Sequence, residues 1–510
     1  MSEISQQFVP AHRRLVQGAL ALTTAVCIAG CGSNYRPSVT PITPTGPPAQ
    51  PSATAFIISA PSSTAAGVAT VVDYSGDTVM ATAAIGPGPQ TVAINSGASE
   101  GWTLNSDGTV ANIPDSTNLQ AKNVTYSTLN PLSTASNPVV ALFSGSLGLY
   151  ALDVSLNEVD VLTGSPDAFK LTVPVDVSPV TMVGVPTGTR YYAISQMVPY
   201  LSSVTVGGTA MTGGIACNVN PHAVTTTGYA DAMETSPNYT VSARIPLGVC
   251  PTYAVASPDT RRVFVLNRGS DNITVINSQN NALNQCAPGV NQNGVPYTCH
   301  PTLSLSAAAG LTHAGPVYAE YNSLTSQLVV ANYDGNSITI IDVALDQYGN
   351  DGPNFGTSFT VPVGTNPASV TVLADGSRAY VANQSDQTVT IVNMSSHTVE
   401  QTLSVTGHPR TVASTQNSLY GKVYVVSPDT PYVTIIRTDQ DIVSTTVLVQ
   451  GNAVDVHTSS PDASSANPNT VSRLPGAGQP CYLPPSAFTT AGAPVTLANC
   501  KVQDPTLFTQ

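Results

Sequence analysis

Four short strands recur along this chain, and the recurrence limits the folds that it can adopt. Residues 364–405 show the pattern best, because β-branched residues cluster in four runs separated by turns rich in Asp, Asn, Ser and Gly. We expect antiparallel strands at Ala368–Leu373, Arg378–Asn383, Thr388–Asn393 and Thr398–Val405. One sheet of this size cannot bury both of its faces, so the pattern requires further copies stacked beside it.

Further copies open at a proline or glycine just before each first strand. The openings lie near Pro89, Pro138, Pro179, Pro251, Pro316, Pro367, Pro409 and Gly451. The copy before Pro89 lacks a first strand, whereas the copy after Gly451 has only one, at Ala453–Thr458. We expect this last strand to complete the first sheet and to close a ring, which removes the exposed sheet edge. The count predicts eight blades, with seven as the alternative if residues 138–244 form one elaborated blade.

One strand of the best copy, Tyr380-Val381-Ala382-Asn383, resembles the name motif of the YVTN-type β-propeller repeat family. The resemblance implies an all-β propeller of four-stranded antiparallel blades, and the repeats place it at residues 53–458. It says little about function, because propellers host many unrelated functions. Propellers related to this family include lactonases, whose chemistry sits at the central channel.

The N-terminus resembles the signal sequence of a bacterial lipoprotein. An apolar run at Leu15–Ile28 follows two arginines and is too short to span a bilayer comfortably. It ends in Ile28-Ala29-Gly30-Cys31, which resembles the lipobox, where the chain is cut before a cysteine that is then lipidated. We therefore expect a signal peptide at residues 1–30, a lipidated Cys31, and a Pro/Ser/Thr-rich tether at residues 31–52. An ordinary signal peptide or an uncleaved anchor is the alternative.

The lipoprotein-like N-terminus predicts a lipid-anchored protein of the bacterial cell envelope, and the cysteine count agrees with this location. Of the 8 cysteines, Cys27 and Cys31 lie in the N-terminal segment, which leaves an even number of 6. An even number in an exported protein predicts disulfides. We expect local pairs, since each then brackets an irregular insertion, although other pairings stay open. The expected pairs are Cys217–Cys250, Cys286–Cys299 and Cys481–Cys500.

Two insertions and a tail interrupt the repeat. We expect long insertions at residues 197–242 and 278–313, where the regular spacing of strands breaks. Loops of this length are usually functional or disordered, and the disulfides favour ordered ones. Residues 459–510, rich in Pro, Ser and Asn, should form an irregular C-terminal extension.

Composition argues against nucleic acid as a partner. Charged residues make up 9% of the 510 residues and the net charge is −13, whereas nucleic-acid binding needs patches of Lys and Arg. The sequence contains no closely spaced Cys/His ligand set and no Gly-rich phosphate loop, so we expect no metal and no cofactor.

Two residues near the start of a first strand, His408 and Arg410, are candidate polar groups of the central channel. No motif assigns them a catalytic role. We therefore expect a membrane-tethered, non-catalytic binding or scaffold module with a protein or glycan partner in the envelope. A lactonase-like hydrolase with its site at the central channel is the alternative.

Overall fold

The computed structural model describes residues 54–458, except 63–64, 74–76, 95–99, 108, 115–123, 130–138, 146, 155, 165–166, 186–188, 200–202, 207–208, 213–215, 219, 236–237, 287–288, 290–297 and 416–420. The chain divides into two compact units, residues 1–50 and 51–510, and every described residue belongs to the second. The predicted signal peptide, Cys31, the tether, the C-terminal extension and the pair Cys481–Cys500 lie outside the described residues. In the described part, no helix is both long enough and apolar enough to cross a membrane.

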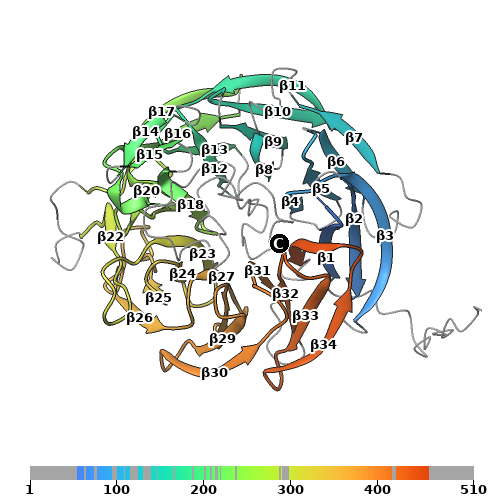
Figure 1. Cartoon of the computed structure of the whole chain (residues 1–510). Coiled ribbons are helices and arrows are strands. Elements are labelled where there is room, and N and C mark those ends of the chain that lie inside the picture. The colour runs from blue at the N-terminus through green and yellow to red at the C-terminus, as the bar shows by residue number, and fades with distance from the viewer. Residues whose placement is uncertain are drawn as a thin grey trace, which may run out of the picture. The chain divides into compact units, whose positions relative to one another are not determined.

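Eight antiparallel blades follow one another in chain order around a ring (Figure 1). Within each blade the strands are hydrogen-bonded in sequence from the innermost to the outermost, and neighbouring innermost strands contact each other around the whole ring. The described chain is therefore an eight-bladed β-propeller.

The first four blades contain the following strands, from the innermost outwards. They are β35 (Asn452–Thr458), β1 (Thr54–Ala60), β2 (Ala66–Asp73) and β3 (Thr78–Pro87); β4 (Thr91–Ile94), β5 (Glu100–Leu104), β6 (Thr109–Pro114) and β7 (Thr125–Thr128); β8 (Val139–Gly145), β9 (Gly148–Asp153), β10 (Glu158–Gly164) and β11 (Asp167–Pro174); and β12 (Pro179–Gly184), β13 (Arg190–Ser195), β16 (Thr227–Glu234) and β17 (Thr240–Val249). Residues 138–244 thus contribute two blades, which decides between eight and seven.

The last four blades follow the same plan. They are β18 (Pro251–Ala256), β19 (Arg262–Asn267), β20 (Asn272–Asn277) and the pair β21 (Ala282–Leu283) and β22 (Thr302–Ser304); β23 (Pro316–Asn322), β24 (Gln327–Asn332), β25 (Ser337–Asp342) and β26 (Ser358–Pro362); β27 (Pro367–Val372), β28 (Arg378–Asn383), β29 (Thr388–Asn393) and β30 (Thr398–Ser404); and β31 (Thr411–Ser414), β32 (Lys422–Val426), β33 (Tyr432–Arg437) and β34 (Ile442–Leu448). The four strands expected at residues 364–405 are all present, two of them with the predicted bounds.

The ring closes through a blade that both ends of the described chain share. Strand β35 pairs antiparallel with β1, from Ala55 opposite Thr458 to Ala60 opposite Asn452. Figure 1 shows the blue strands β1–β3 beside the orange strands of the last blade. The expected closure is therefore confirmed.

The hydrogen bonds of a buried asparagine explain why the motif Tyr380-Val381-Ala382-Asn383 ends in this residue type. The side-chain amide of Asn383, at the end of β28, donates hydrogen bonds to Thr388 Oγ1 at 3.0 Å and Thr390 Oγ1 at 2.8 Å on β29. Asn267 and Asn332 hold the corresponding strands of the two preceding blades with equivalent pairs of bonds. A buried amide needs partners, so this residue fixes the register of two strands in each of the three blades.

Both insertions are shorter than expected and differ in kind. Residues 227–249 form the regular strands β16 and β17, so the first insertion lies between β13 and β16 and includes the hairpin β14 (Ser203–Val206) and β15 (Thr209–Thr212) and the short 3₁₀ helix η1 (Pro221–Ala223). The second interrupts an outer strand, because β21 and β22 both pair with β20. The regular spacing of strands did not predict β16, β17 and β22, because an insertion separates each of them from the earlier strands of its blade.

Candidate functional site

Antiparallel pairing divides the connections between strands into two sets at opposite faces of the ring. The innermost strands begin at one face, which we name the start face, and the turns between second and third strands return to it. The turns between first and second strands lie at the other face, which we name the end face. The first insertion joins a second to a third strand and lies at the start face. The second, in the outer-strand region after β20, begins at the end face.

A disulfide ties the first insertion to the next blade. Cys217 in the insertion is bonded to Cys250, which directly precedes β18, and both residues are buried. Arg268, in the turn between β19 and β20, donates from Nη1 to the carbonyl oxygen of Asn218 at 2.6 Å. The insertion is therefore held by one covalent bond and by a buried guanidinium. A second expected disulfide, Cys286–Cys299, is also present.

The same arginine organises a charged pair in the next blade along the chain. Arg268 donates from Nε and Nη2 to the two carboxylate oxygens of Asp334, at 2.9 and 2.8 Å, which is a bidentate geometry. Burial alone would raise the pKa of Asp334, but the charge of Arg268 and the hydrogen bonds from Arg268 and His222 lower it to about 2. Asp334 is therefore ionised at neutral pH and can accept further hydrogen bonds.

Two histidines and a second carboxylate complete the cluster. His222, in η1, lies with Nε2 3.1 Å from Asp334 Oδ2 and with Nδ1 3.8 Å from Asp271 Oδ2. His313, in the loop before β23, lies with Nδ1 2.7 Å from the same oxygen of Asp271. The two imidazole rings stack with centroids 3.8 Å apart and planes inclined by 14°. We name His222, Asp271 and His313, with Asp334 and Arg268, the start-face cluster.

A glycine lets the chain approach this cluster closely. Gly315 has a φ of +58°, and a Cβ there would stand 1.9 Å from Asp334 Oδ2. Its amide donates to Asp271 Oδ1 at 2.7 Å and fixes that carboxylate beside His313. Any larger residue at this position would collide with the carboxylate of Asp334.

The predicted channel groups His408 and Arg410 do not form one exposed pair. His408 lies in the connection before β31, where its Nδ1 is 2.6 Å from Asp429 Oδ2 and its Nε2 is 3.2 Å from the amide group of Gln387. Its backbone amide also donates to Asp429 at 2.8 Å. Arg410 is only 4% exposed. His408 is thus engaged by a neighbouring turn, and Arg410 offers almost no surface to a substrate.

The pair His408–Asp429 predicts a pH dependence of stability. The hydrogen bond to Asp429 raises the pKa of His408, although partial burial opposes this rise. Burial would raise the pKa of Asp429, but bonds from His408 lower it overall. The contribution of protonated His408 to the free energy of unfolding is complete below the pKa of histidine in the unfolded chain. It is lost as pH rises through the higher pKa of His408 in the folded protein. The contribution of the Asp429 carboxylate to the free energy of unfolding is lost as pH falls through the lowered pKa of Asp429.

We therefore expect His408→Gln to lower the melting temperature most near pH 5–6, with a stability loss of about 1 kcal/mol or less. The difference from wild type should shrink towards higher pH and also in strong acid. The control is His397→Gln, which removes a histidine from a turn at the end face, where its ring stacks on Phe359. A flat difference between wild type and His408→Gln across pH 4–9 would contradict this assignment.

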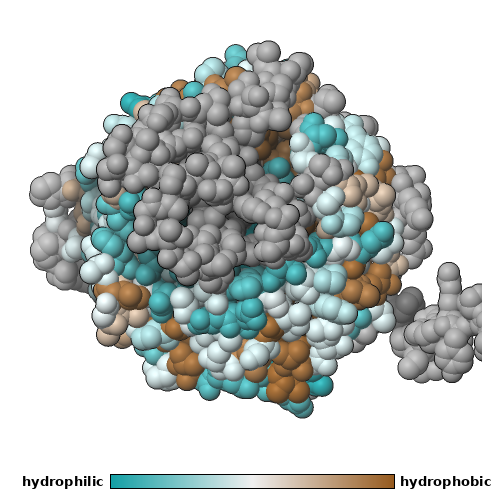
Figure 2. Space-filling view, in the orientation of Figure 1, coloured by the Kyte–Doolittle hydropathy of each residue, from teal (hydrophilic) through white to brown (hydrophobic). Residues whose placement is uncertain are grey.

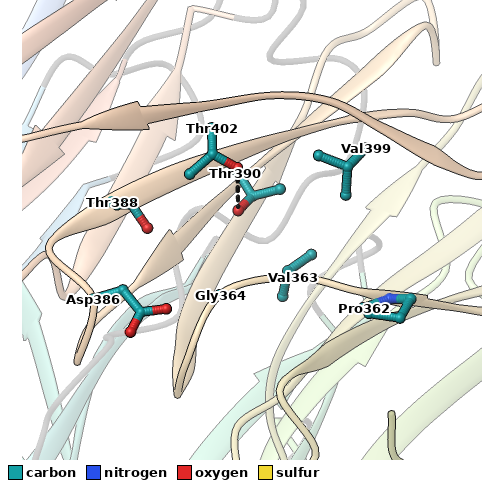
Figure 3. Close-up of a pocket in the computed structure, with 8 residues that line it drawn as sticks. All are labelled: Pro362, Val363, Gly364, Asp386, Thr388, Thr390, Val399 and Thr402. Carbon is teal, nitrogen blue, oxygen red and sulfur yellow. Dashed lines mark hydrogen bonds between the residues drawn. The ribbon is translucent and has the colours of Figure 1, made fainter. Parts of the chain in front are cut away.

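A shallow groove of about 430 Å³ lies between the end of β26 and the outer strands β29 and β30 (Figure 3). Threonine hydroxyls line it, and Thr390 Oγ1 lies 3.5 Å from Thr402 Oγ1. Asp386 is its only charged lining residue, and it accepts a hydrogen bond from the amide of Thr365. The groove therefore offers hydroxyl groups and one carboxylate to a ligand.

Comparisons with known proteins address the fold alone. No family model matches the sequence, and no curated protein shows significant similarity to it. Among solved structures, AztD from Citrobacter koseri is similar with a TM-score of 0.50 and 13% identity, covering 80% of this chain and 97% of that one. A Bacteroides fragilis protein titled as a candidate 6-phosphogluconolactonase reaches a TM-score of 0.46 at 13% identity, covering 81% and 99%. At 13% identity the likeness to AztD supports the propeller fold alone, and neither likeness assigns an activity.

Sequence spacing does not reveal the start-face cluster, because its members come from an insertion, two turns and a connecting loop of three different blades. The usable signal was indirect. Cys217 marks the point at which the insertion is bonded to the next blade, and Gly315 marks a close approach before β23. Neither residue shows which histidines meet, since that depends on the angle between adjacent blades.

Proposed function

We propose that this protein is a lipid-anchored, extracytoplasmic propeller that serves the bacterial cell envelope as a non-catalytic binding module. Its start face would contact a protein or glycan partner. The lipobox-like sequence ending in Cys31 and the resemblance to YVTN-type repeats support this proposal from the sequence. The two disulfides agree with an oxidising compartment.

The disulfide-held first insertion is the observation that carries the proposal. A recognition loop loses less conformational entropy on binding when it is already ordered, so a covalent tie to a rigid ring favours affinity. Cys217–Cys250 and the bonds from Arg268 supply such order at the start face.

Polar side chains beside the two insertions differ in exposure. At the start face, the side chain of His313 is 47% exposed beside the first insertion. Beside the second insertion, the side chain of Asp351 is 1% exposed and that of His300 is 30% exposed. On the side of the ring that Figure 2 shows, apolar residues form separate patches along the lower rim, divided by polar ones. A polar or mixed partner therefore fits this protein better than an extended apolar one.

The anchor is tested by Cys31→Ser. We expect this variant to lose acylation and to leave the membrane fraction, or to accumulate with its signal peptide attached, because a lipid chain provides about 0.8 kcal/mol per buried methylene. The measurements are membrane fractionation and mass spectrometry of the mature N-terminus. Unchanged acylation and membrane partitioning in Cys31→Ser would contradict the anchor.

The partner is tested by crosslinking intact cells that express either the wild-type protein or Cys31→Ser, followed by purification and mass spectrometry. We expect an envelope protein or glycan to be captured by the anchored form and lost, or strongly reduced, in the unanchored form. A Cys27→Ser variant is the matched control, because it removes a cysteine from the same segment without altering the proposed acylation site. Capture of no partner by either form would contradict a binding role.

A further inference from the structure

We propose that His222, Asp271 and His313 form a binding site for a divalent transition-metal ion, for which Zn²⁺ is the appropriate probe. One ligand atom from each of the three side chains lies within 4.8 Å of the other two. Two imidazoles and one carboxylate, with water in a fourth position, are a ligand set that Zn²⁺ accepts. This inference is independent of the proposed function, since it needs neither the anchor nor a partner.

The donor atoms must rearrange slightly to bind an ion. A Zn–N bond of about 2.0–2.1 Å places tetrahedral ligands about 3.3 Å apart. His313 Nδ1 and Asp271 Oδ2 are already closer than this, at 2.7 Å, while His222 Nδ1 stands 3.8 Å from the same oxygen. Because stacked rings do not direct both lone pairs at one point, one ring must turn. His313, with its half-exposed side chain, has the room to do so.

The second contact of His222 selects the tautomer that a metal needs. Its Nε2 lies 3.1 Å from Oδ2 of Asp334, the carboxylate that Arg268 holds in a bidentate pair, so we assign the donated proton to Nε2. In a neutral ring this leaves the Nδ1 lone pair facing Asp271 Oδ2 and, at 3.4 Å, the carbonyl oxygen of Gly269. A lone pair facing two oxygens is satisfied by a cation. Carboxylate–histidine–metal arrangements use the second nitrogen of the ring in this way.

The charge balance of the cluster also favours a cation beside Asp271. Asp334 is neutralised by the bidentate pair with Arg268. Among the described residues, the side chain of Asp271 contacts the amide of Gly315 and the two histidines, and its salt-bridge partners include no Lys or Arg. The disulfide Cys217–Cys250 and the amide of Gly315 position the donors before any ion arrives.

The test is a titration of untagged, chelator-treated protein with Zn²⁺ in a calorimeter, together with the visible absorption spectrum after addition of Co²⁺. We expect binding of one Zn²⁺ per chain and intense Co²⁺ bands typical of tetrahedral coordination. Asp271→Asn, which can still accept the hydrogen bond from Gly315, and His313→Gln should each weaken Zn²⁺ binding about 10–100-fold or more. His397→Gln is the matched control and should bind like wild type.

His313→Gln keeps the test decisive because a half-exposed side chain can be replaced without loss of the fold, which circular dichroism will verify. The proposal is overturned if wild-type protein binds no Zn²⁺ at millimolar concentration, as a merely hydrogen-bonded cluster would behave. It is also overturned if Zn²⁺ binds equally well to wild type, Asp271→Asn and His313→Gln, which would place the ion elsewhere.

Discussion

Replacement of Asp351 by alanine is expected to lower the free energy of unfolding by about 3–5 kcal/mol, because it leaves a buried charge without its partner. Arg262, whose side chain is 2% exposed, donates to this carboxylate at 3.1 Å. The amide of Asn284 and both the backbone and ring nitrogens of His300 also donate to it, at 2.8–3.0 Å. One carboxylate thus joins β19, the second insertion and the loop after β25.

Chemical denaturation of Asp351→Ala and wild type measures this loss. The matched control is Asp439→Ala, which breaks the exposed pair with Arg437 and should leave the midpoint almost unchanged, since solvent screens such pairs. Equal midpoints for Asp351→Ala and wild type would show that the buried network contributes nothing to the fold.

Removal of the closing strand is expected to have the other large effect. A chain that ends at Gly451 loses β35 and exposes the edge of β1, so it should aggregate or unfold at much lower temperature. Val454 packs with Val92 of the second blade, while Val456 packs with Ala413 of the last. Burial of these two valines alone contributes about 3–6 kcal/mol.

A chain that ends at Thr458 is the control, because it keeps β35 and loses only residues beyond it. We expect it to remain monomeric in size-exclusion chromatography and to melt close to the full-length protein. If the chain ending at Gly451 were equally monomeric and stable, the shared blade would not be what closes the ring.

The sequence predicted most of the fold because each blade repeats one local pattern. Four innermost strands begin at the prolines that the repeat predicted, which are Pro179, Pro251, Pro316 and Pro367. The match of the first and last fragments predicted the pairing of β1 with β35. These features depend on β-propensity and turn residues, which are local properties that can be read without knowing the arrangement of blades.

The candidate site could not be predicted in the same way. The sequence places His408 near a first strand but does not show that Asp429 of the adjacent turn is its partner. The sequence cannot pair His222 with His313, because nothing in its spacing shows that an insertion of one blade reaches a loop two blades away. Tertiary geometry brought them together, and Arg268 and Cys217 hold that geometry.

A pair of photo-crosslinking variants tests the binding role of the start face most directly. Leu311, 43% exposed, lies in the loop before β23 at the start face, and Leu324, 70% exposed, lies in the turn after β23 at the end face. Each would be replaced in turn by a photo-reactive amino acid in intact cells. We predict a crosslinked partner from position 311 and none from position 324, whereas a partner captured only or equally from position 324 would contradict the account.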